Sequence, residues 1–208
     1  MSLVKYNNNS ISAITAAAGL ASGDMTLIKT LTADGSGDNL SFVDGSSDVV
    51  LDNTYPIYMF KFINIHPAND DVHLSFNASI DSGSNYNVTK TTTNFRANHD
   101  EGDSATDLSY RTGGDIAQGT GFQNIAAEVG NDNDQCAVGT LHLFDPSSTT
   151  FVKHFISRCN IYNASNYNRD DYVAGYFNTT SAVDAVQFKM SSGNIDSGTI
   201  KLYGIKDS

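Results

Sequence analysis

Residues 182–206 read AVDAVQFKMSSGNIDSGTIKLYGIK, and this stretch decides the fold. Val186 and Phe188 alternate with small or polar residues, and the alternation resumes at Ile200 and Leu202 after a turn rich in Ser, Gly, Asn and Asp. Period-two alternation on both sides of a glycine-containing loop predicts an antiparallel hairpin with one buried face. A strand this late in the chain has to pair with strands made earlier, so we expect the hairpin to close a sheet.

The composition favours strands and turns over helices. The chain has 208 residues, of which 39% are hydrophobic and only 17% are charged. Much of the polar remainder is Asn, Ser, Thr, Gly and Asp, whose short side chains hydrogen-bond local backbone and favour turns. A chain of this length can bury a core without disulfides or metals. We therefore expect an all-β protein, a single antiparallel β-sandwich that is jelly-roll-like.

The first half of the chain predicts a hairpin followed by two buried strands. Residues 40–44 and 47–52 flank Asp44-Gly45, a dipeptide that suits a tight hairpin turn. Residues 58–66 are nearly all large and apolar, which predicts a strand covered on both faces. Residues 72–80 alternate cleanly and predict a strand with one buried face. Its inward residues are expected to be Val72, Leu74, Phe76, Ala78 and Ile80.

The second half predicts a polar strand and a central hairpin. Residues 85–95 are rich in Thr, which forms strands well and fills cores poorly, so this strand should have an exposed face. Residues 96–107 are acidic and predict a loop, while residues 119–129 could form a strand or a single short helix. Residues 138–145 and 150–160 predict a hairpin joined by a four-residue turn.

The chain divides into an N-terminal arm, residues 1–24, and a β-sandwich domain, residues 25–208. The arm opens with an Asn-rich stretch and continues with an Ala-rich one that has little to bury against itself. We expect it to anchor the protein and to become ordered only on a binding partner. The alternative is a frayed terminus, because first residues are usually poorly ordered.

The charge balance argues against partners that carry many phosphates. The formal net charge is -11, and no basic run occurs, so the surface should repel nucleic acid and anionic lipid. Solubility is the simplest reason for the acidity. No segment is apolar enough to span a bilayer, and no signal peptide is evident. Cys136 and Cys159 lack metal or redox spacing and should be free thiols in a reducing cytoplasm, although a bridge between them stays open.

No pattern of histidines indicates a metal centre or a catalytic site. The five histidines contain no HxH or HExxH arrangement; they are His66, His73, His99, His142 and His154. A metal site would need three or four ligands that converge from separate strands. His154 falls on an apolar face of its predicted strand, which is typical of a hydrogen-bonded histidine in a core.

Acidic residues give two weak signals, and we expect neither to be a site. Residues 131–134 read NDND and suggest a calcium loop, but the glycine and the distal glutamate of an EF-hand are missing, so a solvated turn is favoured. The pairs Asp100-Glu101 and Asp170-Asp171 could form a glycosidase dyad only if they bracket a sugar at a set distance. Adjacent acids arise by chance in polar loops. The sequence therefore predicts no catalytic, cofactor-binding or metal-binding residues.

Tyrosines are plentiful while tryptophan is absent. They include Tyr86, Tyr110, Tyr162, Tyr167, Tyr172 and Tyr176, several of which fall in predicted loops. An aromatic face with nearby Asn and Asp is a way for lectin-like surfaces to hold glycans. Ordinary strand packing is the simpler interpretation of the same residues.

Four stretches carry a resemblance to a class of proteins. They are MSLVKYNNNSISAI (1–14), YMFKFINIHPAND (58–70), GTLHLFDPSSTTFVKHFIS (139–157) and residues 173–206, whose ending SSGNIDSGTIKLYGIK is the most specific. Together they resemble virion structural proteins of tailed phages, particularly tail-fibre-like proteins of marine and cyanobacterial phages. The resemblance implies a part of the virion that assembles in the host bacterial cytoplasm, and it carries over no catalytic residues.

From this resemblance we expect a non-enzymatic virion structural protein. It would be an exposed tail-fibre or baseplate appendage, bound to other virion proteins through residues 1–24. A capsid decoration or cement protein is one alternative, a carbohydrate-binding host-recognition module that binds a surface glycan is a second, and a glycan-degrading spike is the weakest. We expect a homotrimer with residues 85–95 and the following acidic loop near the interface, although a monomer fits the sequence almost as well.

Overall fold

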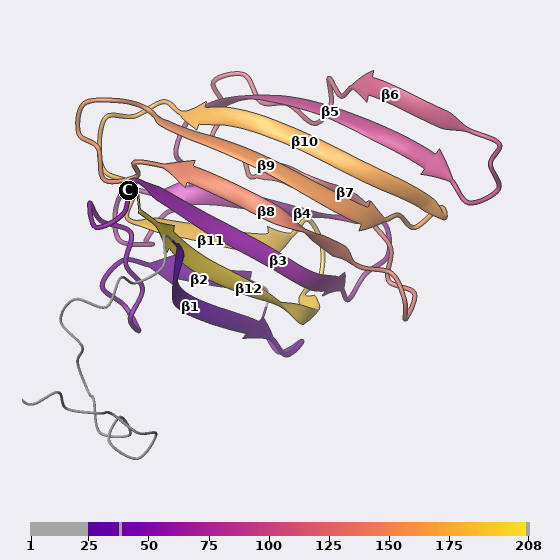
Figure 1. Ribbon diagram of the computed structural model, residues 1–208, viewed down its shortest axis with the longest axis horizontal. Helices are drawn as coiled ribbons and strands as arrows, with labels where there is room; N and C mark the ends of the chain where they lie inside the picture. The colour runs from indigo at the N-terminus through magenta and orange to yellow at the C-terminus, as the bar shows by residue number, and fades with distance from the viewer. Residues whose placement is uncertain (1–24, 38, 207–208) are drawn as a thin grey trace, which may run out of the picture.

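The protein is a sandwich of two antiparallel sheets (Figure 1). The computed structural model describes residues 25–37 and 39–206, and the described residues contain no helix. The strands are β1 Met25–Ala33, β2 Asn39–Val43, β3 Ile57–Pro67, β4 Val72–Ser79, β5 Lys90–Asp100, β6 Thr106–Tyr110, β7 Gln123–Val129, β8 Ala137–Phe144, β9 Lys153–Tyr162, β10 Tyr167–Phe177, β11 Ala185–Met190 and β12 Ile195–Ile205. The predicted antiparallel β-sandwich is confirmed, and its jelly-roll connectivity stays a prediction. The anchoring arm lies outside the described residues.

The two sheets differ in size. One has eight strands in the order β1-β12-β3-β8-β9-β10-β5-β6, and the other has four in the order β2-β11-β4-β7. In the smaller sheet, β7 packs over β9 and β10 of the larger sheet. Strands β1 and β6 are the two edges of the larger sheet, so they lie at opposite ends of the molecule (Figure 1).

The predicted C-terminal hairpin is wrong, although both of its strands exist. Strand β11 pairs with β2 and β4 in the smaller sheet, whereas β12 pairs with β1 and β3 in the larger one. Phe188 on β11 and Leu202 on β12 are both fully buried, because the two strands present their apolar residues to the same core. Alternation fixes which side chains face inward, but it does not specify the sheet to which a strand belongs.

Phe188 lies at the centre of the core between the sheets. Its ring centroid is 5.1 Å from that of Phe60, 5.2 Å from that of Phe62 and 6.1 Å from that of Phe76. Phe76 in turn packs edge-to-face against Phe155 at 4.9 Å. Aromatic pairs prefer such tilted and offset arrangements, so rings from both sheets interdigitate in the core.

Two predictions for the first half of the chain need correction. Residues 47–52 form no strand; β2 is followed by a turn in which the Gly45 N–H donates to the Val49 carbonyl and the Leu51 N–H donates to the Asp44 carboxylate. Strand β3 is covered on one face only, because Lys61 on its other face is exposed.

Strand β4 shows the opposite departure from its predicted pattern. Phe76 faces the core as expected, whereas Ile80 lies beyond the strand and is exposed. Ser75 and Asn77, predicted to face solvent, are also buried. The Asn77 side-chain amide donates to the carbonyls of Tyr86 and Thr120, so connecting segments cover the outer face of this strand.

The central hairpin of β8 and β9 is confirmed, but its turn is longer than predicted. Leu143 pairs with Phe155, and the connection spans residues 145–152 instead of four residues. Residues 119–129, for which strand and helix were both open, contain β7.

Strand β5 has the exposed face that was predicted, but it begins at Lys90 rather than at residue 85, and its buried face is polar. Lys90, Thr92 and Asn94 point inward and are buried, whereas Thr93 and Phe95 lie on the exposed outer face. The strand also continues to Asp100, through the first five of the twelve residues predicted as a loop, and it pairs with β10 on one side and β6 on the other. A strand with polar residues on its inner face gives this end of the sandwich a polar interior.

Candidate functional site

The inner faces of β5 and β10 bring four polar side chains together. Arg96 and Asn98 follow the inward alternation of β5, and Arg169 and Asp171 follow that of β10. The register places Arg96 opposite Asp171 and Asn98 opposite Arg169. Residues directly opposite each other on one face are close neighbours, so these four side chains form a polar floor.

Glu128 at the end of β7 is held over this floor. Its φ of 58° is in the left-handed region, which non-glycine residues adopt only where their surroundings impose it. The Glu128 N–H donates to His73 Nδ1 at 2.8 Å, and its carbonyl accepts from the Asn163 side chain at 2.8 Å and from the Ala164 N–H at 3.2 Å. These bonds fix the backbone and direct the carboxylate toward the arginines.

Three of the chain's four arginines, Arg96, Arg111 and Arg169, converge on Glu128, and we call this group the arginine cluster. The nearest oxygens of Glu128 lie 2.7 Å from Arg169 Nη2, 3.2 Å from Arg111 Nη2 and 3.9 Å from Arg96 Nη1. Burial alone would raise the pKa of Glu128, but hydrogen bonds and charge from Arg169 and Arg111 outweigh it, so this pKa lies below its usual value.

Arg169 is the structural member of the arginine cluster. Its side chain is 3% exposed, and its other nitrogens donate to Asn98 Oδ1 at 3.1 Å and to the Ala127 carbonyl at 2.9 Å. The adjacent carboxylate of Asp171 accepts from the Ala127 N–H at 2.8 Å, and burial raises the pKa of Asp171 to about 6. These hydrogen bonds tie β7 to β10.

Arg96 is the member whose hydrogen-bonding capacity is not used. Its Nε and Nη1 atoms are buried and have no hydrogen-bond partner among the described residues. The carboxylates nearest to them are Asp107, 3.8 Å from Nε, and Glu128, 3.9 Å from Nη1, and both distances exceed hydrogen-bonding range. The two carboxylates balance the charge of Arg96, but its Nε and Nη1 atoms make no hydrogen bond to the described residues.

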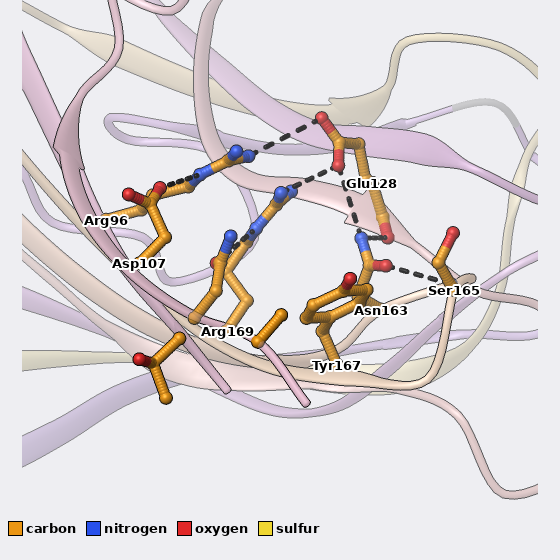
Figure 2. A pocket seen from close by; sticks show the side chains of 10 residues that line it. Arg96, Asp107, Glu128, Asn163, Ser165, Tyr167 and Arg169 are labelled. Atoms are coloured by element: carbon orange, nitrogen blue, oxygen red, sulfur yellow. Dashed lines mark hydrogen bonds and ion pairs between the residues drawn. The ribbon is translucent and has the colours of Figure 1, made fainter. Parts of the chain in front are cut away.

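A pocket of about 340 Å³, which we call the arginine pocket, opens beside Arg96 (Figure 2). Strands β5, β10 and β7 supply its floor, and the start of β6 and the connections that precede β6 and β10 supply its rim. Its lining residues are Arg96, Asn98, Ala105, Thr106, Asp107, Glu128, Asn163, Ser165, Tyr167 and Arg169. Charged, amide and hydroxyl groups together with one aromatic ring suit a small polar ligand, and the volume is within the usual range for such sites.

A second hollow lies on the outer face of the larger sheet and has a different chemistry. There Phe95 and Tyr172 stack with ring centroids 4.6 Å apart, and Arg158 lies 5.0 Å from the centre of the Tyr172 ring. Ile156 beside them is 53% exposed. This groove is mainly apolar, so it offers fewer groups than the arginine pocket to orient a polar ligand.

The histidines are dispersed, and no group of three or more His, Cys, Asp or Glu in the described part of the chain could hold a metal ion. His154 is exposed beside Tyr176, so its predicted core position is wrong. Lys153 occupies the interior in its place and donates to the Phe151 and Thr179 carbonyls. The reason is the register of the hairpin, which turns His154 outward. His73 supports the arginine cluster through Glu128.

The two acid pairs do not converge. Asp170 lies on the outer face of β10, where it accepts from Arg158, whereas Asp171 points inward. Successive residues of a strand face opposite sides, so this pair cannot bracket one sugar. Asp100 accepts from the Ser104 and Ala105 N–H groups within a turn.

The remaining candidates from the sequence are the possible calcium loop, the two cysteines and the tyrosines. In the predicted loop 131–134, the Asn131 N–H donates to Asp70 and the Asp132 N–H donates to Gln135. Cys136 and Cys159 are both free, and burial raises the pKa of the Cys159 thiol to about 12. Of the six tyrosines, Tyr167 lines the arginine pocket, Tyr172 lines the hollow on the outer face, and Tyr176 lines a neighbouring hollow beside His154.

Sequence reasoning missed the arginine cluster because its members are far apart along the chain. The sequence offered only a compositional signal, namely four arginines in an acidic chain; the structure shows that Arg96 and Arg169 occupy inward positions of their strands. No family model matches the chain, and no curated protein or solved structure matches it either. Among the described residues, no helix is long and apolar enough to cross a membrane.

Proposed function

We propose that this protein is a non-enzymatic structural component of a phage virion. It is an exposed appendage of the tail-fibre or baseplate type, with residues 1–24 as its anchor and a β-sandwich of jelly-roll type as its presented domain. The observation that carries the proposal is the resemblance of four stretches to virion proteins, most specifically SSGNIDSGTIKLYGIK at residues 191–206.

The arrangement of the sheet supports this role. Residues 1–24 join the described domain at Met25, which begins β1 at one edge of the larger sheet. The arginine pocket lies near the opposite edge, between β5, β10 and the start of β6. An anchor before β1 would therefore hold the domain by one edge, while β6 beside the pocket forms the opposite edge (Figure 1).

Deletion of residues 1–24 tests the anchor. The truncated chain should melt within a few degrees of the full chain, because the arm contributes little to the core. It should be lost from particles purified from the host, as measured by immunoblot against the full chain. Truncated protein that aggregates, or that still enters particles, would contradict the proposal. Density for the intact particle separates a tail appendage from a capsid decoration protein, since these differ in where the arm docks.

The pocket favours a second candidate function, a host-recognition module that binds carbohydrate. Its hydroxyl and amide groups and the ring of Tyr167 are the groups that hold sugars in binding proteins. This role is compatible with the first, because an appendage can present a binding site. Binding to a glycan array by the full chain tests it.

We also propose a homotrimer, with a revised interface. Strand β5 is paired on both sides, so its backbone is not free to join another copy. The free edge belongs to β6, where Leu108 is 74% exposed, and the acidic connection from β5 adjoins it. Exposed edge strands with apolar side chains are natural sites for strand pairing between chains.

A further inference from the structure

We propose that β7 contains an acid-sensitive switch, in which protonation of His73 releases the backbone that directs Glu128 into the arginine pocket. The switch belongs to the fold around the pocket and is independent of the virion role. Its parts are an irregularity in β7 and two titratable side chains that hold it.

Strand β7 carries a β-bulge opposite His73. Between two regular pairs of β4 and β7, Ala127 and Glu128 oppose the single residue His73. A bulge takes backbone groups out of the ladder and changes the direction of a side chain. Here the redirected side chain is that of Glu128, whose φ is 58° and whose carboxylate reaches Arg169 Nη2 at 2.7 Å (Figure 2).

Side chains replace the ladder bonds that the bulge lacks. The Ala127 N–H donates to the Asp171 carboxylate at 2.8 Å, and the Glu128 N–H donates to His73 Nδ1 at the same distance. A backbone N–H that loses its acceptor inside a fold is costly. The left-handed conformation of Glu128 therefore depends on His73 as an acceptor.

His73 can serve as this acceptor only while its ring is neutral. A ring nitrogen accepts a hydrogen bond only when it carries no proton, so the neutral ring holds its proton on Nε2. Protonation gives Nδ1 an N–H of its own, which then faces the N–H of Glu128. Two donors cannot share one bond, so the ring and the bulge must separate, and the carboxylate of Glu128 loses its fixed direction.

Charges of both signs surround the ring. Two carboxylates and two guanidinium groups act on it: Glu128, Asp71, Arg169 and Arg111. Burial is the largest influence on the pKa of His73 and lowers it, the arginines lower it further, and the carboxylates oppose them. On the other side of β4, strand β11 contributes the Ser191 hydroxyl, which accepts from the His73 backbone N–H, and Lys189, whose ammonium lies over the Phe122 ring.

Acid favours the released form of the bulge. The pKa of His73 is lowered from its ordinary value of 6.5 in the closed form, so the released form binds a proton that the closed form does not. Release therefore becomes easier as pH falls below 6.5. Asp171 acts in the opposite sense, because burial raises its pKa to about 6 and its protonated form favours the packed bulge. The test must separate the two groups.

Hydrogen exchange of the Glu128 amide in the full chain, measured by NMR between about pH 5 and pH 7.5 and corrected for the intrinsic rate, tests the switch. His73→Asn is the comparison, because the Asn side-chain oxygen can replace Nδ1 and does not titrate. Relative to this variant, the protection of Glu128 in the natural chain should fall by up to about tenfold per pH unit below 6.5. Asp171 is common to both chains, so its titration cancels.

His142→Asn is the matched control. Burial also lowers the pKa of His142, which lies on β8 in the larger sheet, away from the bulge. Its substitution should leave the exchange profile of Glu128 as it is in the natural chain. If His73→Asn does not fold, the natural chain decides the matter, because the Glu128 amide shift should have the same pH midpoint as the His73 ring.

Three outcomes would overturn the switch. They are the same pH profile of Glu128 protection in the natural chain and in folded His73→Asn, loss of the pH dependence in His142→Asn, and an amide midpoint that differs from that of the His73 ring. None of them bears on the virion proposal, because entry into particles is measured with the arm deletion.

Discussion

At the scale of single residues, the polar end of the sandwich depends on charges buried with specific partners. Lys90 is fully buried, and its ammonium donates to the carbonyls of Val88 and Gly121. Burial lowers the pKa of Lys90 to about 8. Arg169 and Asp171 are likewise buried and hydrogen-bonded. Charged groups remain inside a fold only when such partners compensate their lost hydration.

Asp171→Asn should change how stability depends on pH. The pKa of Asp171 is about 6 in the folded protein and 3.8 as its ordinary value, so between these values the folded state holds a proton that the unfolded chain has released. The stability linked to Asp171 is therefore fully present below about pH 4 and is lost as pH rises through about 6. Relative to the Asn variant, the natural chain should lose up to about 3 kcal/mol of unfolding free energy as the pH rises from about 4 to about 6.

Urea unfolding at several pH values between roughly 4 and 7 measures the difference. Asp103→Asn is the control, since the Asp103 side chain is 92% exposed and should leave the profile of the natural chain unchanged. A stability difference between Asp171→Asn and the natural chain that stays constant with pH would show that burial does not raise this pKa.

At the scale of elements, the alternation of apolar and polar residues located the strands better than it predicted which of their faces are buried. On β4 the inward face was predicted from Phe76 and its neighbours, but the outward face is also buried. On β5 the polar residues face inward, because other polar segments, rather than a second apolar sheet, cover that strand. The Thr92 hydroxyl, for example, donates to Gln123 and accepts from the Ile116 N–H.

Two substitutions on β4 separate its faces. Phe76→Ala should cost about 3–5 kcal/mol of unfolding free energy, because it removes a buried ring that contacts Phe155 and Phe188. Ser75→Ala should cost about 1 kcal/mol, because it deletes one hydrogen bond to the Lys189 carbonyl. Urea unfolding measures both, with Phe151→Ala as a control at a site that is 70% exposed.

The exposed control should change stability by less than about 0.5 kcal/mol. Equal losses for Phe76→Ala and Ser75→Ala would contradict the assignment of Phe76 to the central core.

At the scale of the whole molecule, the eight-stranded sheet has two edges with different roles in our proposal. Strand β1 follows residues 1–24, the proposed anchor, and β6 lies at the opposite edge beside the arginine pocket. Both edges expose apolar side chains, with Leu27 on β1 at 50% and Leu108 on β6 at 74% exposure. Closed symmetry is the rule for homo-oligomers, so an association through one edge should give a ring of defined size.

Light scattering of the full chain should give the mass of a trimer. Leu108→Lys should reduce this mass, because a charge on the free edge opposes strand pairing. Leu27→Lys, the matched change on the other edge, should leave the mass unchanged. A monomer at tens of micromolar, or a trimer that Leu27→Lys disrupts and Leu108→Lys does not, would contradict the proposed interface.

The sequence by itself determined the all-β class and the inward face of several strands. Phe76, Phe188 and Leu202 were assigned to the core correctly. Alternation depends only on neighbouring residues along one strand, so it can be recognised in the local sequence. Turn chemistry likewise separated most of the strands. These features need no information from distant parts of the chain.

Only the tertiary structure decided which strands are partners and where the polar groups meet. It placed β11 and β12 in different sheets, and it brought Arg96, Arg111 and Arg169 to Glu128. Strand pairing and the covering of a strand by loops depend on contacts between residues far apart in sequence, which no local pattern encodes. The candidate site was therefore absent from the sequence prediction, which placed Arg96 in a loop and left residues 119–129 open between a strand and a helix.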